Sequence, residues 1–198
     1  MFTEEHQFEP LLPQKDLEAF GEQARAIIGD SLRLGSGAHE TTRAELRDLV
    51  RAMNSYYSNR IEGQSTHPLN IERALKLDFS EKPGVAKLQR IALAHIEAEK
   101  ELEAQTEGGA KPLLSSFAIG AHRALYGRLS EADRTTDDHV VVEPGGMRVT
   151  DVKVGSHVPP GWKSIPRFLK RFDTVYGRVQ GANDLLISKR PVKALLLA

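Results

Sequence analysis

Apolar residues recur at every third or fourth position through most of the first 130 residues. This is the spacing of residues that share one face of an α-helix, and glycine and proline mark the places where such segments begin or end. The pattern predicts helices over about 17–29, 41–62, 68–77, 83–103 and 113–129. Two more are expected toward the C-terminus, at about 164–176 and 189–198.

The segment 41–62 carries the sharpest local signal. Its apolar side is formed by Leu46, Leu49, Val50, Met53, Tyr57 and Ile61. Gly63 follows as the expected helix stop. Ser58 and Glu62 are one helical turn apart, so they lie above one another beside this apolar side. A carboxylate in the last turn meets the partial negative charge of the helix dipole, so Glu62 suggests a cation outside the helix that receives it. An exposed glutamate at a frayed helix end is the simpler alternative.

The pattern changes to β-branched residues after residue 139. Three valines at 140–142 precede the turn residues Pro144-Gly145-Gly146, and the segment 147–154 follows as a second strand. We therefore expect a β-hairpin over about 140–158. The predicted fold class is mainly α, a helical bundle with one β-hairpin.

Composition narrows the classes of function. The chain has 198 residues with 27 basic and 27 acidic side chains, and this balance argues against a dedicated nucleic-acid-binding protein. The absence of cysteine excludes disulfide scaffolds, thiolate zinc sites and cysteine nucleophiles. The N-terminus is polar and the apolar runs are short, so we expect neither a signal peptide nor a membrane span, and a soluble, cytoplasmic protein.

Histidine and glutamate give weaker signals for a metal site. His95 and Glu99 are one helical turn apart, and His122 lies in the next long helix. These residues do not make a complete ligand set, and histidines hydrogen-bonded within the fold are the preferred interpretation. We predict no metal site.

Three stretches of the sequence resemble the Fic family of proteins. Ser58-Asn59-Arg60-Ile61-Glu62-Gly63 resembles the inhibitory motif of that family, a serine or threonine followed three residues later by glutamate and glycine or asparagine. The flanking segments 49–57 and 64–68 are similar to the N-terminal region of the family, and 147–160 is similar to its flap hairpin and the proline-rich turn after it. The resemblance runs from about Leu11 to Ala198. It implies an N-terminal helical region, 1–63, that ends in the inhibitory helix, and a partial Fic domain over 64–198.

The resemblance also implies an activity. Most Fic proteins transfer AMP from ATP, with Mg²⁺, to a hydroxyl of a target protein. By resemblance, Glu62 would inhibit this reaction by pairing with an arginine that otherwise holds the γ-phosphate, and Ser58 would steady that contact. The flap residues Val154, Gly155, Ser156 and His157 would line the nucleotide pocket and align the target by strand-like pairing.

The sequence departs from the family at the catalytic signature. That signature is a histidine, x-Phe-x, an acidic residue, Gly-Asn-Gly-Arg and a second arginine, and nothing in residues 1–198 matches it. It supplies the general base, the Mg²⁺ ligand and the phosphate-binding groups. We therefore expect this chain to carry no catalytic residue and to be inactive by itself, as a segment cut off before the signature.

Two functions remain open at this point. The first is the N-terminal and central part of a protein adenylyltransferase, with ATP bound only in the full-length form. The alternative is a non-catalytic module that docks or inhibits a partner protein. A target protein bound through the flap is the expected partner, and a homodimer is left open.

Overall fold

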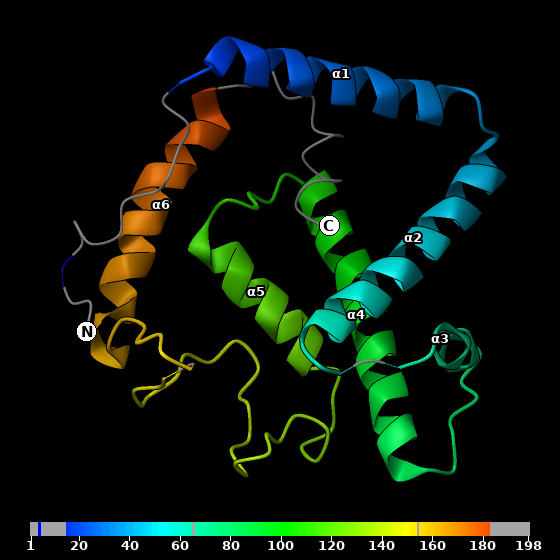
Figure 1. The fold of residues 1–198 in the computed structure, drawn as a ribbon, viewed down its shortest axis with the longest axis vertical. Coiled ribbons are helices and arrows are strands. Elements are labelled where there is room, and N and C mark those ends of the chain that lie inside the picture. The colour runs from blue at the N-terminus through cyan, green and yellow to red at the C-terminus, as the bar shows by residue number, and fades with distance from the viewer. Residues whose placement is uncertain (1–3, 5–14, 65, 154, 183–198) are drawn as a thin grey trace.

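The computed structural model describes residues 4, 15–64, 66–153 and 155–182. These residues form six α-helices and a 3₁₀ turn, so the protein is mainly α, as the periodicity predicts (Figure 1). In chain order the elements are α1 (Leu17–Ser36), α2 (Glu40–Ile61), α3 (Pro68–Leu75), α4 (Pro83–Glu107), α5 (Ser115–Tyr126), η2 (Trp162–Ser164) and α6 (Ile165–Ala182). No helix among these residues is long and apolar enough to cross a bilayer.

α1 and α4 extend further than the sequence predicts. α1 continues through Gly29 to Ser36. Gly29 does not take the positive φ that ends a helix, so it costs α1 only about 1 kcal/mol and does not stop it. α4 continues to Glu107 and ends at Gly108, followed by Gly109 at φ 98°. The helix expected at 189–198 lies outside the described residues.

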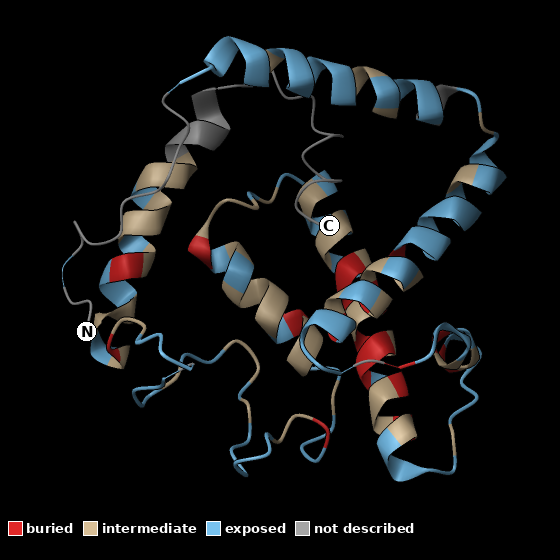
Figure 2. Cartoon of the chain, in the orientation of Figure 1, coloured by how far each residue is buried: buried red, intermediate tan, exposed pale blue. Residues whose placement is uncertain are grey.

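α4 is the centre of the packing. α2, α3 and α5 all pack against it, and α6 packs against α5 (Figure 1). The apolar core is small: Ile71 of α3 meets Ala92 and Ile96 of α4, with Ala52 and Tyr56 of α2 packed over them. α1 extends across one end of the molecule and is almost wholly exposed (Figure 2).

α2 packs on α4 with its polar side. Arg51, Ser55 and Asn59 are its buried residues. The Ser55 hydroxyl donates to the Ala92 carbonyl at 3.0 Å, and the Arg51 guanidinium pairs with Glu103 of α4. The apolar side predicted from the sequence does lie along one face, but that face points away from α4. Its members Leu46, Leu49, Val50, Met53, Tyr57 and Ile61 are between 47% and 82% exposed.

The β-hairpin expected over 140–158 does not form among its described residues. The valine segment instead turns back on the residues before it, through a bridge between Thr135 and Val141. His139, at φ 61°, makes the reversal possible, and the Val142 N–H donates to Arg134 O at 3.0 Å. The prediction was wrong because periodicity shows which residues favour extended backbone but not which segment they pair with.

The second half of the expected hairpin is held by side chains. The Arg148 guanidinium donates to the carbonyl of Thr150 at 2.7 Å and to that of Pro160. The Asp151 carboxylate accepts from the N–H of Trp162 at 2.9 Å. These contacts satisfy loop backbone groups that strand pairing would otherwise satisfy.

Gln89 of α4 joins the loop after α3 to the core. It is fully buried. Its amide donates to the carbonyls of Asn70 and Asp78, both at 3.1 Å, and its oxygen accepts from the N–H of Ser80 at 2.7 Å. One side chain therefore bonds a carbonyl of α3 and two backbone groups of the α3–α4 connection.

Replacing Gln89 by alanine is expected to lower the free energy of unfolding by about 3 kcal/mol, because three backbone groups lose the hydrogen bonds of a fully buried side chain. Urea unfolding followed by circular dichroism measures the change. Gln105→Ala is the matched control, since Gln105 is exposed at the end of α4, and its effect should stay within about 0.5 kcal/mol. Equal losses in the two variants would contradict the role of Gln89.

Candidate functional site

The end of α2 is fixed by a Schellman turn. The Gly63 N–H donates to Arg60 O at 3.1 Å, and the Gln64 N–H donates to Asn59 O at 2.7 Å. Gly63 takes φ 74°, a conformation that residues with a side chain rarely adopt, so glycine is required as the stop that the sequence predicts. This turn places Glu62 at the C-cap in a defined backbone conformation.

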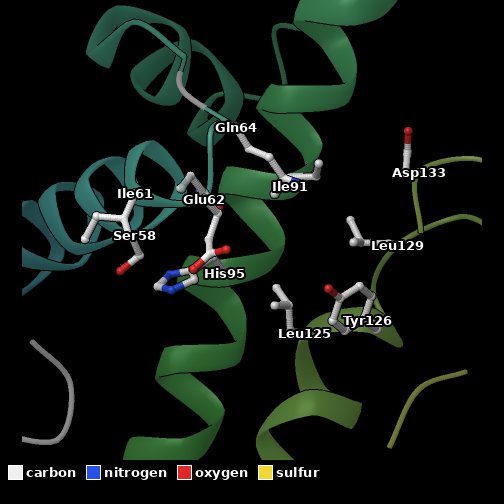
Figure 3. Close-up of a pocket in the computed structure, with 11 residues that line it drawn as sticks. Ser58, Ile61, Glu62, Gln64, Ile91, His95, Leu125, Tyr126, Leu129 and Asp133 are labelled. Carbon is white, nitrogen blue, oxygen red and sulfur yellow. The ribbon is translucent and has the colours of Figure 1, made fainter. Parts of the chain in front are cut away.

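Ser58 and Glu62 lie on the same side of α2, as their spacing predicts, and both line a cleft. The cleft has a volume of about 450 Å³ and lies between α2, α4, α5 and the turn after α5. Its lining residues are Ser58, Asn59, Ile61, Glu62, Gln64, Ile91, His95, Leu125, Tyr126, Leu129 and Asp133. Figure 3 shows Ser58 and Glu62 extending from the end of α2 toward the His95 ring, with Tyr126 on the facing helix.

His95 is a partly buried titratable group in the wall of the cleft. Its Nδ1 is buried and has no hydrogen-bond partner among the described residues. Burial lowers the pKa of its imidazole below the usual value, so the ring is neutral at neutral pH. The Glu62 carboxylate points toward this ring (Figure 3).

Asp133 forms a fixed part of the wall. Its carboxylate accepts two hydrogen bonds from the Arg90 guanidinium, at 2.6 and 2.8 Å, and a third from the Ser130 hydroxyl at 3.0 Å. The hydrogen bonds from Arg90 and then from Ser130, together with the positive charge of Arg90, lower the pKa of Asp133 despite its burial. Asp133 is therefore ionised at neutral pH, and its carboxylate is engaged by Arg90 and Ser130.

The lining suits a cation better than a phosphate. Its described lining residues include two carboxylates, from Glu62 and Asp133, and no lysine or arginine. A triphosphate placed here would meet the Glu62 carboxylate, and the nearby Arg90 guanidinium is already engaged by Asp133. The described residues also contain no group of three or more histidine, aspartate or glutamate side chains placed to hold a metal ion. The residues present therefore do not fit ATP or Mg²⁺ by themselves.

The other two groups weighed as metal ligands belong to the scaffold. Nδ1 of His122 accepts from the N–H of Gly145 at 2.8 Å, and its ring packs against Tyr126 at 4.5 Å between centroids. Glu99 is buried under α2, where it accepts from the Asn54 amide at 3.3 Å. Burial raises the pKa of Glu99, and the Asn54 hydrogen bond and the charge of Arg51 offset part of this effect.

The flap residues lie elsewhere. Gly155, Ser156 and His157 are exposed and are not among the residues that line the cleft. Val154 lies outside the described residues. The structure thus brings Ser58 and Glu62 together with His95, and none of the three described flap residues lines the same cleft.

Sequence reasoning assigned no role to His95 or Tyr126. His95 follows Ile91 and Ala92 on the apolar side of α4, and a histidine on such a side is the one signal that was present. Tyr126 is the last residue of α5, and only the crossing of α5 with α4 places it at the cleft.

The lowered pKa of His95 predicts a pH dependence of stability. The unfolded chain takes up the proton first as the pH falls below about 6.5, the usual histidine value, so the free energy of unfolding falls from there through the lower pKa of the folded state. Urea unfolding at a series of pH values between about 7.5 and 5 measures this loss.

His95→Gln should make the loss smaller. Part of the slope should remain, because burial also lowers the pKa of His122. His157→Gln, at an exposed position, is the control and should leave the slope as in the wild type. If the free energy of unfolding changed with pH equally in the wild type and in His95→Gln, His95 would not have a lowered pKa in the folded protein.

No protein-family model, no curated protein and no solved structure matches this chain.

Proposed function

We propose that this chain is the N-terminal and central part of a Fic-type protein adenylyltransferase, an enzyme that transfers AMP from ATP to a hydroxyl of a target protein. In this proposal it carries the autoinhibitory glutamate and the target-docking segment but not the catalytic loop. The observation that carries the proposal is the position of Glu62, which is held by the turn at Gly63 and points into a cleft without a basic lining residue.

The electrostatics of the α2 end support an inhibitory role for Glu62. A carboxylate at a helix C-terminus meets the partial negative charge of the last carbonyls. An incoming guanidinium would offset that cost and would form a strong, geometrically specific pair. Ser58 lines the cleft one turn earlier and would hydrogen-bond to the same group.

The chemistry of the reaction requires groups that residues 1–198 do not supply. ATP and Mg²⁺ bring the transferable AMP and the charge neutralisation, and the family signature would bring the base and the phosphate-binding groups. The cleft residues described above would position and restrain such a loop through Glu62 and Ser58. We therefore expect the chain alone not to transfer AMP.

The exposed backbone of residues 155–157 supports target docking. Residues 155–157 are exposed and belong to no strand of the described chain, and His157 lies in an isolated bridge. An exposed segment of this kind is where an extended peptide could pair. The side-chain contacts of Arg148 and Asp151 hold the residues before and after it. A target segment would add to it by backbone hydrogen bonds.

A non-catalytic binding or inhibitory module is the second candidate. The apolar face of α2 that points away from α4 favours it, because exposed apolar faces of this kind mark sites of protein association. In this case the chain would act by docking a partner protein.

The inhibitory role is tested by restoring the missing loop. The full chain is joined to a C-terminal segment that carries His-x-Phe-x-acidic-Gly-Asn-Gly-Arg, and incorporation of labelled AMP into protein is measured. Glu62→Gly should raise the rate about 10- to 100-fold, the equivalent of one charge-assisted hydrogen bond of roughly 1.5–3 kcal/mol. Glu62→Gln, which keeps the size of the side chain, should raise it in the same direction.

Glu81→Gly is the control, since Glu81 is exposed and lies outside the cleft. It should leave the rate unchanged. An equal rate in wild type, Glu62→Gly and Glu62→Gln would exclude the inhibitory role. Reproducible AMP transfer by the unmodified chain would contradict the expectation that it carries no catalytic residue.

A further inference from the structure

The outer face of α2 is an exposed apolar surface of the described residues. It consists of Leu46, Leu49, Val50, Met53, Tyr57 and Ile61, which we call the outer α2 face, and it is between 47% and 82% exposed. The opposite side of the same helix, with Arg51, Ser55 and Asn59, is buried on α4. An apolar helix side that the chain itself leaves exposed is typical of a site where another protein surface packs.

The outer α2 face is nearly symmetric about Met53. Leu49 and Tyr57 lie four residues before and after it, and Leu46 and Ile61 lie seven before and eight after. A sequence that reads similarly in both directions from its centre presents the same side chains to a second helix running the opposite way. In an isologous contact around a two-fold axis at Met53, Met53 would meet Met53 of the second copy and Leu49 would meet its Tyr57. Leu46 would meet Ile61 in the same way, so apolar side chains would meet along the whole face.

The charges beside the face have the matching arrangement. Glu45 lies eight residues before Met53 and Arg60 lies seven after it, and the two are about 60° apart around the helix, along one edge of the face. In an antiparallel pair centred on Met53, Glu45 of each copy faces Arg60 of the other. Glu45 and Arg60 form no ion pair among the described residues. The Arg60 guanidinium donates to the Tyr56 hydroxyl at 3.3 Å and lies over the Tyr56 ring.

We propose that the outer α2 face is a homodimer interface, in which α2 packs antiparallel against α2 of a second copy around an axis at Met53. The symmetric apolar pattern supplies the buried surface, and the Glu45–Arg60 pairs at both ends set the direction and register. Ile61 is the one member of the outer α2 face that also lines the cleft with Ser58 and Glu62. The proposal does not rest on the adenylyltransferase assignment, because none of its observations involves Glu62.

Sedimentation velocity of the full chain at about 1–300 µM tests the proposal. We expect a monomer–dimer equilibrium with a dissociation constant on the order of 10 µM, because an interface one helix wide is at the small end of stable contacts. Met53→Arg should make the chain monomeric over this range. Leu69→Arg is the control: it changes an exposed leucine of α3, 56% exposed, and should leave the equilibrium unchanged. Circular dichroism checks that both variants are folded.

A charge exchange tests the direction of packing. Glu45→Arg and Arg60→Glu should each weaken the dimer about 3- to 10-fold, because each substitution disturbs two symmetry-related surface pairs. The double variant should restore an affinity near that of the wild type. A parallel arrangement would not bring these residues together, so failure of the double variant to recover would overturn the antiparallel register.

Cross-linking provides a readout that does not depend on affinity alone. The chain contains no cysteine, so Met53→Cys creates a single thiol at the proposed axis. A short bis-maleimide should link two copies of Met53→Cys much faster than two copies of Leu69→Cys. If the wild type were monomeric at all concentrations, or if the dimer persisted unchanged in Met53→Arg, the proposal would be wrong. Either result would show that another segment covers the outer α2 face or that it stays exposed.

Discussion

The polar contact between α2 and α4 is the constraint on which the rest of the structure depends. Burial by itself would lower the pKa of the Arg51 guanidinium, but its hydrogen bonds to Glu103 and Asp48 raise it above the usual value. Breaking a buried pair of this kind costs about 3–5 kcal/mol, so the pair holds α2 in one position on α4. The hydrogen bond from Ser55 to the Ala92 carbonyl, one turn further along, fixes the same register.

This register decides where the end of α2 lies. α2 cannot slide along α4 without losing these directional hydrogen bonds. The end of the helix is therefore held at the cleft, with Asn59 one turn beyond Ser55 and with Ser58 and Glu62 beside it. Apolar contacts are less directional and would tolerate such sliding better. The polar contact therefore supplies position, and the small core of Ile71, Ala92 and Ile96 supplies the hydrophobic stabilisation.

The helices and the start of the site were predictable from local chemistry, whereas the pairing of segments was not. Helix periods and the glycine stop at Gly63 are properties of neighbouring residues, and both were predicted correctly. The orientation of α2 could not be predicted, because the apolar side of a helix normally faces the core. Here the polar side is buried instead, since Arg51 pairs with Glu103, which lies 52 residues away in the sequence. The valines at 140–142 likewise pair with earlier residues through a left-handed His139 that no periodic pattern marks. His95 joins the cleft only through the packing of α4 against α2 and α5.

The division of α2 into a polar inner side and an apolar outer side has a consequence for how this protein tolerates sequence change. Substitutions at Arg51 or Ser55 alter contacts on which folding depends. Substitutions at Leu49 or Met53 alter only groups that the folded chain leaves half exposed, so their effect on the stability of a single copy is small. The residues that hold the fold together and the residues that form the exposed apolar surface thus lie on opposite sides of one helix. During evolution, the side chains of the outer α2 face can therefore change without disturbing the fold.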